Sequence, residues 1–282
     1  MADNNRLFNR KCSVSIGPNG GTGTKVDQQF RVVFKVNKTI HADANTVNVQ
    51  IYNLSEETRA SLLRDNQVVM IEAGYESGTE VLTIAEVTRS VVVHLPPDII
   101  LDVEAADGAK TVRDRKINIS FKKGRTVRSV LDAIAAELAL PIKVTGAQPT
   151  GSYANGVSFS GTVASALDRV CLKGGVIWSI QDGALQISHR TKASNARGVL
   201  LTPDTGLIGS PERIDDIEET QAGERKRLGW RVKSLLNPQI RPGDRLQIKS
   251  AEVDGVFRAE NVNHFGDTEG GDWYTEAEVF EE

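Results

Sequence analysis

The C-terminal part of the chain alternates apolar and polar residues in short runs that turn-forming residues separate. The runs are Trp230–Leu236, Arg245–Ile248, Gly255–Val262 and Trp273–Phe280. A period of two places successive side chains on opposite faces of a strand, so each run predicts a strand on a half-buried sheet. Pro, Gly and Asp between the runs favour short antiparallel connections. His264–Asp272, rich in Gly and Asp, is expected to form a loop, with His264 shaping a turn.

The first 106 residues show the same period with one helix inserted. Strands are predicted at Phe30–Val36, Thr46–Tyr52, Val68–Ala73, Val81–Val87, Ser90–His94 and Ile99–Glu104. Ser55 precedes Glu56 and Glu57, which is typical of a helix N-cap followed by acids in the first turn. Several antiparallel strands with one helix suggest a small barrel or sandwich.

The region between these parts contains an internal repeat. Ser120-Phe121, Gly124, Thr126-Val127 and Leu131-Asp132 are echoed by Ser158-Phe159, Gly161, Thr162-Val163 and Leu167-Asp168. In each copy a strand leads through a glycine to a threonine N-cap and an amphipathic helix. Farther on, Asp182-Gly183 between two apolar runs predicts a two-residue hairpin turn.

These patterns predict an α+β fold that is mainly β. We expect two small β-barrel-like domains, residues 1–106 and 194–282, which flank a duplicated αβ middle region, residues 107–193. A chain of 282 residues is long enough for two or three domains and needs no disulfide for stability.

Charge is spread unevenly along a chain whose net charge is −3. Residues 1–41 hold seven Lys/Arg against two Asp/Glu, residues 224–249 hold eight against two, and residues 252–282 hold one against ten. One interpretation is a set of solvated faces. The other is complementary edges that select a neighbouring subunit in a ring, with Arg225-Lys226-Arg227 at the seam. The net charge and the 5% aromatic content disfavour a nucleic-acid-binding protein.

Residues able to do chemistry are scattered. The four histidines, His41, His94, His189 and His264, stand alone, and Cys12 and Cys171 lack metal or disulfide spacing. Gly17–Gly23 lacks the phosphate-loop pattern and is expected to be a hairpin loop. Ser210 lies in a turn-rich connector and outside any nucleophile motif. We therefore expect no catalytic, metal or cofactor site and no enzyme. No apolar run reaches the length of a membrane span, and the N-terminus lacks the apolar core of a signal peptide.

Several motifs occur in an order that resembles a known family. They are Asn45–Leu63, Thr202–Ile214, Leu235–Asp244, Gly255–Ala259, His264–Thr268 and Trp273. Together they resemble the baseplate hub proteins of tailed bacteriophages, the late-control and tail-hub proteins of contractile-tailed phages. The resemblance touches both ends and most of the chain.

The resemblance implies a structural role in a phage tail or a contractile injection system. In such a hub, three chains form a homotrimeric ring in which the two terminal tube-like domains of each chain lie side by side. The ring adapts the hexameric tail tube to the threefold central spike and forms part of the channel for DNA ejection. The implied partners are further copies of the chain, the tail tube protein, the central spike protein and other baseplate proteins, with the tape measure protein as a further candidate. DNA is met only in transit, no membrane insertion is expected, and assembly takes place in the host cytoplasm before the protein resides in the virion tail baseplate.

Two alternatives stay open at this point. The repeated αβ unit is similar to small glycan-binding or ring-building repeats, so the chain could be a cell-wall binding module carried on a tail or secretion device. An enzyme whose site assembles from distant histidines and acids is the other alternative. Sedimentation, pelleting with peptidoglycan and substitution of the histidines separate the three.

Overall fold

The computed structural model describes residues 7–18, 21, 23–64, 67–108, 112, 115–146, 148–194, 198–220 and 223–281. The N-terminal elements are β1 (Arg10–Pro18), β2 (Thr24–Val26), β3 (Val32–Thr39), β4 (Thr46–Tyr52), α1 (Glu56–Leu62), β5 (Gln67–Tyr75), β6 (Gly78–Leu95) and β7 (Asp98–Ala106). Ser55 caps α1, and its side chain accepts a hydrogen bond from the backbone N–H of Thr58, as predicted.

The middle and C-terminal elements follow. The middle region contains β8 (Lys116–Phe121), β9 (Arg125–Thr126), α2 (Val127–Glu137), β10 (Ile142–Thr145), β11 (Ser152–Tyr153), β12 (Val157–Thr162), α3 (Val163–Gly174), β13 (Val176–Gln181) and β14 (Ala184–His189). The C-terminal region contains β15 (Val199–Leu201), the 3-10 turn η2 (Pro203–Thr205), β16 (Leu207–Thr220), β17 (Gly223–Leu235), β18 (Arg245–Lys249), β19 (Asp254–Asp267) and β20 (Trp273–Phe280).

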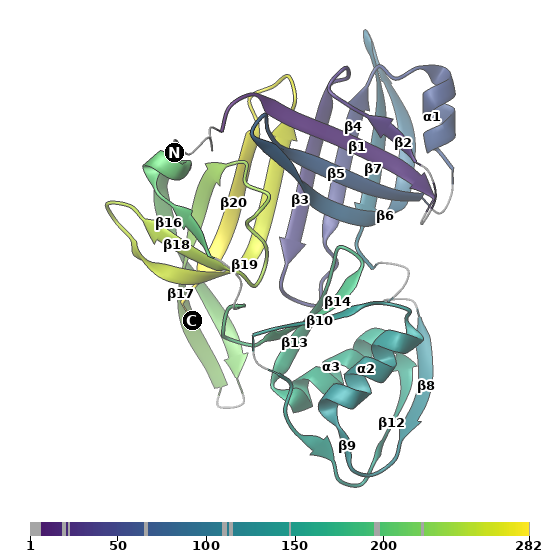
Figure 1. The fold of residues 1–282 in the computed structure, drawn as a ribbon, viewed down its shortest axis with the longest axis vertical. Helices are drawn as coiled ribbons and strands as arrows, with labels where there is room; N and C mark the ends of the chain where they lie inside the picture. Colours follow the sequence, from purple (N-terminus) through teal and green to yellow (C-terminus); the bar gives the residue numbers. More distant parts are fainter. Residues whose placement is uncertain are drawn as a thin grey trace.

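The two terminal regions share one large sheet (Figure 1). Its described strands run in the order β16-β17-β20-β19-β3-β4-β7-β6-β5-β1-β2, and β18 and β15 extend it from β19. The N- and C-terminal regions meet where β3 pairs antiparallel with β19, with Val36 opposite His264. The prediction of a mainly β fold is confirmed, and among the described strands no closed barrel is found.

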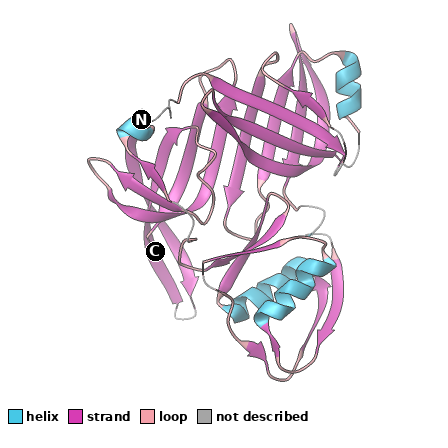
Figure 2. Cartoon of the chain, in the orientation of Figure 1, coloured by secondary structure: helices cyan, strands magenta, loops and turns pink. Residues whose placement is uncertain are grey.

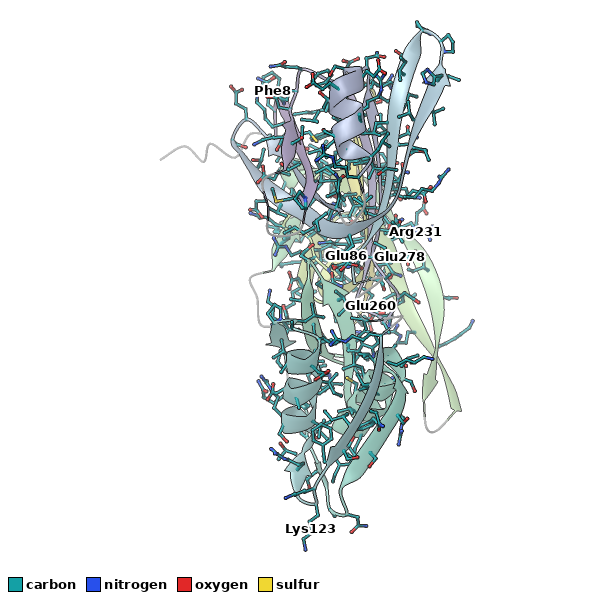
Figure 3. The ribbon with its side chains drawn as sticks, turned by 90° about the vertical axis from the view of Figure 1, so that its right-hand side faces the viewer. Phe8, Glu86, Lys123, Arg231, Glu260 and Glu278 are labelled. Carbon is teal, nitrogen blue, oxygen red and sulfur yellow. The ribbon has the colours of Figure 1, made fainter. Side chains whose placement is uncertain are left out.

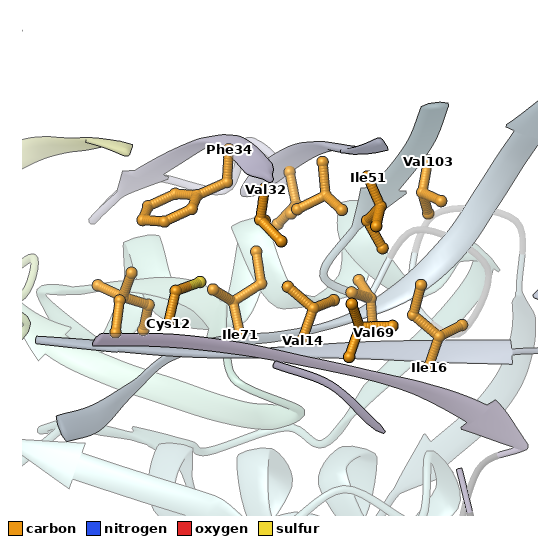
Figure 4. Packing of buried hydrophobic residues seen from close by; sticks show 14 of the residues in the cluster. Cys12, Val14, Ile16, Val32, Phe34, Ile51, Val69, Ile71 and Val103 are labelled. Atoms are coloured by element: carbon orange, nitrogen blue, oxygen red, sulfur yellow. The ribbon is translucent and has the colours of Figure 1, made fainter. Parts of the chain in front are cut away.

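The N-terminal half of the sheet folds over itself into a sandwich. The predicted strands Val81–Val87 and Ser90–His94 are one strand, β6, which pairs with β5 along its first half and with β7 along its second. A register shift between Val87 and Arg89 lets β6 bend from one layer to the other. Figure 4 shows Val14, Ile16 and Ile71 of one layer facing side chains of the other, including Phe34 and Ile51. Cys12 lies in this core, and burial raises the pKa of its thiol to about 12.

The middle region contains the two helices α2 and α3 (Figure 2). Buried side chains around these helices give the region a hydrophobic core of its own. Thr126 and Thr162 cap the two helices as predicted, each accepting a backbone N–H three residues later. The predicted apolar stripe of α2 is buried, as Val130, Leu131 and Ile134 show. The strands β8 and β12 pair antiparallel with Ser120 directly opposite Ser158, so the matched segments of the sequence lie side by side.

Two expectations for the C-terminal region are wrong. His264 is not in a turn but inside β19, opposite Thr275, because its polar side chain finds a hydrogen-bonding partner on the buried face. Ser210 does not lie in a connector but in β16, where a register shift between Ile208 and Glu212 accommodates Pro211. In both places, polar or turn-forming residues inside a strand interrupt the alternation of apolar and polar side chains, so the segment resembles a loop.

In the described part of the chain, no helix has the length and apolar character needed to cross a membrane.

Candidate functional site

The turn between β13 and β14, Asp182-Gly183, contacts the large sheet although β13 and β14 belong to a separate three-stranded sheet. We call this contact the junction. Asp182 and Gly183 adopt φ angles of 53° and 76°. Positive φ at both central residues is what a tight hairpin turn of this kind requires, and glycine adopts it at little cost. The predicted hairpin is confirmed, with Gln181 paired to Ala184.

Lys38 in β3 provides the cation at this junction. Its Nζ lies 2.7 and 2.9 Å from the two carboxylate oxygens of Asp182, and its side chain is 3% exposed. The same carboxylate accepts a hydrogen bond from the backbone N–H of Ile84 in β6, at 3.3 Å. A buried ammonium group is costly unless it is paired and hydrogen-bonded, so this ion pair fastens the hairpin to the sheet.

Asp107, directly after β7, holds the same turn through its backbone. Its carboxylate accepts hydrogen bonds from the N–H groups of Asp182 and Gly183, the second at 3.1 Å. Burial raises the pKa of Asp107 to about 6, and the charge of Asp182 adds to this, whereas the two N–H groups and Lys38 oppose it. The pKa of Asp107 is thus above its ordinary value while its carboxylate accepts both hydrogen bonds from the hairpin turn.

Asn45 completes the junction with amide hydrogen bonds. Its Nδ2 donates to the carbonyl oxygen of Ile180 at 2.9 Å and to Oε1 of Gln181 at 3.0 Å. Gln181 in turn donates to the carbonyl oxygen of Thr39 at 2.7 Å. Asn45 is 1% exposed, so these bonds satisfy polar groups that water does not reach. The junction is a dense polar contact between two separate hydrophobic cores.

A second buried ionic cluster lies around Glu260 in β19, at the waist of the molecule (Figure 3). Both oxygens of Glu260 accept hydrogen bonds from Arg227 at 2.9 Å, and Arg258 also donates to this carboxylate. Arg258 reaches the carbonyl oxygen of His189 in β14 at 3.0 Å, which links the sheet to the middle region again. Burial alone raises the pKa of Glu260, but hydrogen bonds from His41 and Arg227 and the charge of Arg258 outweigh it and hold the pKa well below its usual range.

A third set of contacts stabilises the seam between the terminal regions. Arg31 forms a two-point ion pair with Asp267, at 3.2 and 2.7 Å, and Arg10 donates to the carbonyl oxygen of Gly270 at 2.6 Å. These residues are far apart in the sequence but adjacent across the seam where β3 pairs with β19. The geometry of this seam is therefore fixed by charge-assisted hydrogen bonds as well as by the strand pairing.

The four histidines do not converge. His264 is buried, and burial together with Lys38 and Arg241 lowers its pKa to about 3, so its ring is neutral at pH 7 and bonds to Thr275 at 2.9 Å. His41 lies beside Glu260, His189 ends β14, and His94 lies on the exposed end of β6. Among the described residues, no group of three His, Cys, Asp or Glu side chains has metal-binding geometry. Cys171 is buried in α3, and burial raises the pKa of its thiol to about 12.

The basic and acidic blocks of the C-terminal sequence lie on neighbouring strands. Arg231 pairs with Glu278 at 2.8 Å, and Lys233 pairs with Glu276 at 3.5 Å, across the β17–β20 ladder. Arg227 pairs with Glu260, as described above. Arg225, Lys226 and Arg227 are the residues expected at a seam between ring subunits. Of these, the side chain of Arg225 lies outside the described part of the structure. Three cations of the basic block thus pair with three acids of the acidic block within one sheet.

The sequence offered Arg225–Arg227 as a possible subunit seam, but it gave no indication of the junction at the Asp182-Gly183 turn. Lys38, Asn45 and Asp107 look like ordinary surface residues in the sequence. Only the Asp182-Gly183 turn carried a local signal. Burial of the other three depends on which strands the hairpin meets, and that information is absent from local patterns.

The fold is similar to that of solved phage tail proteins. The tail protein of prophage MuSo2 from Shewanella oneidensis is similar, with a TM-score of 0.67, 11% identity and coverage of 95% of this chain and 96% of that one. A tail protein from Neisseria meningitidis also matches with a TM-score of 0.67, at 13% identity and coverage of 98% and 97%. The E. coli protein c3393, a component of the type VI secretion system, matches with a TM-score of 0.60, 9% identity and coverage of 89% and 73%.

The family follows from the sequence itself. Residues 12–255 match the model of the family described as baseplate hub gp41, and the chain belongs to this family. The resemblance seen in the motifs is thereby confirmed. The protein is a structural component of a phage tail baseplate, and its family is one of structural hub proteins. A search of the curated proteins finds no significant match.

Proposed function

We propose that three copies of the chain form a closed ring that adapts the hexameric tail tube to the threefold central spike. In this ring the two terminal domains, residues 1–106 and 194–282, act as tube-like, barrel-like halves that share a fold, and the duplicated region 107–193 projects from them. The ring forms part of the channel through which DNA leaves the particle. Its partners are the tail tube protein, the central spike protein and other baseplate proteins, with the tape measure protein as a further candidate, and assembly takes place in the host cytoplasm.

One observation carries the proposal. The N- and C-terminal regions lie edge to edge in one sheet through the pairing of β3 with β19. Each chain therefore offers two neighbouring units of antiparallel sheet, and three chains offer six. Six similar units suit contact with a sixfold tail tube, and the threefold arrangement of the chains suits contact with a threefold spike. Family membership supports the location in the baseplate.

Native mass spectrometry and sedimentation of the purified chain, alone and with its spike protein, test the ring. Trimers, or trimers formed on addition of the spike, are expected. A chain that stays monomeric under both conditions contradicts the proposal. Pelleting with peptidoglycan by a monomeric chain would favour the cell-wall binding alternative instead.

A further inference from the structure

The middle region is strongly basic in an otherwise acidic chain. Residues 107–193 contain 13 Lys/Arg and 6 Asp/Glu, whereas the rest of the chain contains 21 Lys/Arg and 31 Asp/Glu. A separate hydrophobic core supports this region, so its charge is displayed on a distinct lobe. Such an asymmetry indicates an electrostatic role for one part of the molecule.

The described acids of the lobe are already engaged within the chain. Two pair with arginines, one accepts a hydrogen bond from an indole N–H, and two belong to the junction; they are Asp132, Glu137, Asp168, Asp107 and Asp182. Few negative charges therefore remain to neutralise the exposed cations of the lobe.

Five exposed cations lie on the segment from the end of β8 to β9 and on α3, and two of them lie over aromatic rings. We call them the distal basic patch: Lys122, Lys123, Arg125, Arg169 and Lys173. None of the five forms an ion pair with a described residue. Lys123 lies at the extreme end of the long axis of the molecule (Figure 3).

Two cations of the patch, Arg169 and Lys173, lie over aromatic rings. The guanidinium group of Arg169 lies 5.0 Å from the ring centre of Phe159, and the ammonium group of Lys173 lies 5.2 Å from that of Tyr153. The two rings are in edge contact at 6.4 Å. Arg125 pairs with Tyr153 in the β9–β11 ladder, and the N–H of Gly124 donates to the carbonyl oxygen of Tyr153 at 2.8 Å. Cations fixed over rings lose little freedom on binding, which favours a specific contact over a diffuse one.

We propose that the distal basic patch is a docking surface for an acidic surface of another baseplate protein. Charge complementarity between exposed surfaces fixes orientation and speeds association, which suits ordered assembly. The inference rests on the family and on the charges of the lobe, and it holds whether or not the chain forms the proposed ring.

Two other occupants are less well matched to the surface. Single-stranded nucleic acid binds by stacking bases on exposed rings, but Phe159 is 2% exposed and Tyr153 is covered by Lys173. In a second copy of the chain, Glu260, Glu276 and Glu278 of the C-terminal region already pair with cations of their own sheet. Exposed acids such as Glu269 and Asp272 are still present there, so self-association is one outcome that the test must separate. An acidic partner protein remains the occupant that the charges favour.

The test reverses three of the charges. The variant Lys122→Glu/Lys123→Glu/Arg125→Glu alters exposed positions at the end of the lobe. A matched control, Lys25→Glu/Arg64→Glu/Lys249→Glu, makes the same change in net charge on exposed positions outside the lobe. Binding of fluorescent poly-L-glutamate to the full chain is measured at low and physiological salt. We expect the patch variant to bind about tenfold more weakly than the control variant at low salt, with a smaller difference as salt is added.

Three results would overturn the proposal. The first is equal loss of poly-L-glutamate binding in the patch and control variants. The second is tighter binding of oligo(dT) than of poly-L-glutamate at equal salt, with selective loss in the patch variant, which would assign the patch to nucleic acid. The third is self-association of the purified chain that the patch variant alone abolishes, which would assign the patch to a second copy.

Complementation in the particle gives a second readout. A phage lacking the hub gene is supplied with wild-type chain, patch variant or control variant, and tails are imaged. The patch variant should leave tails without complete baseplates although its thermal unfolding matches wild type, and the neutral variant Lys122→Gln/Lys123→Gln/Arg125→Gln should give an intermediate defect. Normal baseplates with the patch variant would contradict the proposal.

Discussion

The large sheet and the middle lobe handle charge in opposite ways. In the C-terminal part of the sheet, cations and acids face one another across neighbouring strands, as Arg231 and Glu278 do, and the cluster at Glu260 is buried. In the lobe, the cations of the distal basic patch face solvent without described ion-pair partners. The charges of the sheet pair within the fold and stabilise it. The cations of the distal basic patch have no such pairs, as we propose for charges that bind another molecule.

The largest effect is expected at Glu260, the buried carboxylate of the sheet. The variant Glu260→Gln removes the carboxylate that neutralises Arg227 and Arg258, and buried cations without a counter-charge are strongly destabilising. We expect a loss of about 3 kcal/mol or more in the free energy of unfolding, measured by urea denaturation at pH 7. Glu276→Gln, which removes a half-buried cross-strand pair with Lys233, is the control and should cost less than about 1 kcal/mol. Equal effects of the two variants would show that the buried cluster is not special.

Lys38 tests whether the junction holds the lobe. In Lys38→Met, Asp182 loses its cation and the hairpin turn loses its tie to β3, at a cost of about 2 kcal/mol, since Asp182 keeps part of its contact with water. Hydrogen exchange should show faster exchange of the backbone N–H groups of residues 180–184. Lys35→Met, an exposed position on the same strand, serves as the control. Unchanged exchange in the hairpin would mean that the junction is held by other contacts.

His264 lies where β3 pairs with β19, and it makes the stability of the protein depend on pH. Its pKa is about 3 in the folded chain and about 6.5 in the unfolded chain, so the unfolded state binds the proton more readily as pH falls below 6.5. The contribution of His264 to stability is therefore present above pH 6.5 and is lost toward acid, by about 2 kcal/mol at pH 5. Asp107, whose raised pKa of about 6 stabilises the fold as pH falls, opposes it in the same range.

The two contributions separate in variants. Relative to wild type, His264→Gln should lose less stability between pH 7 and 5, and Asp107→Asn should lose more, when urea denaturation is followed at half-unit pH steps. Parallel curves for the wild type and both variants would refute the assignment of these groups.

The smallest effect is expected from the patch itself. Reversing Lys122, Lys123 and Arg125 should change the free energy of unfolding by less than about 0.5 kcal/mol, because exposed charges without partners contribute little to folding. Differential scanning calorimetry measures this directly. A large loss of stability would place these residues among the structural charges and remove the contrast between the lobe and the sheet.

Local patterns predicted local structure well. The strand Thr46–Tyr52, the caps Ser55, Thr126 and Thr162 and the turn Asp182-Gly183 all lie where the sequence indicated. Each depends on the period of side-chain direction or on hydrogen bonds within a few residues. Predictions failed where polar residues lie inside strands, as at His264 and Ser210, because a partner strand satisfies them and their sequence resembles a loop.

By itself, the sequence determined that the fold is mainly β, that the middle region contains two helices, and which family the chain belongs to. Only the tertiary structure decided that β3 pairs with β19, and that three cations of the basic block pair with acids of the acidic block. It also decided that Lys38, Asn45 and Asp107 meet the Asp182 hairpin. The physical reason is range. Strand period and helix caps are set by neighbours along the chain, whereas a buried charge is stable only if the fold brings its partner to it from a distant segment.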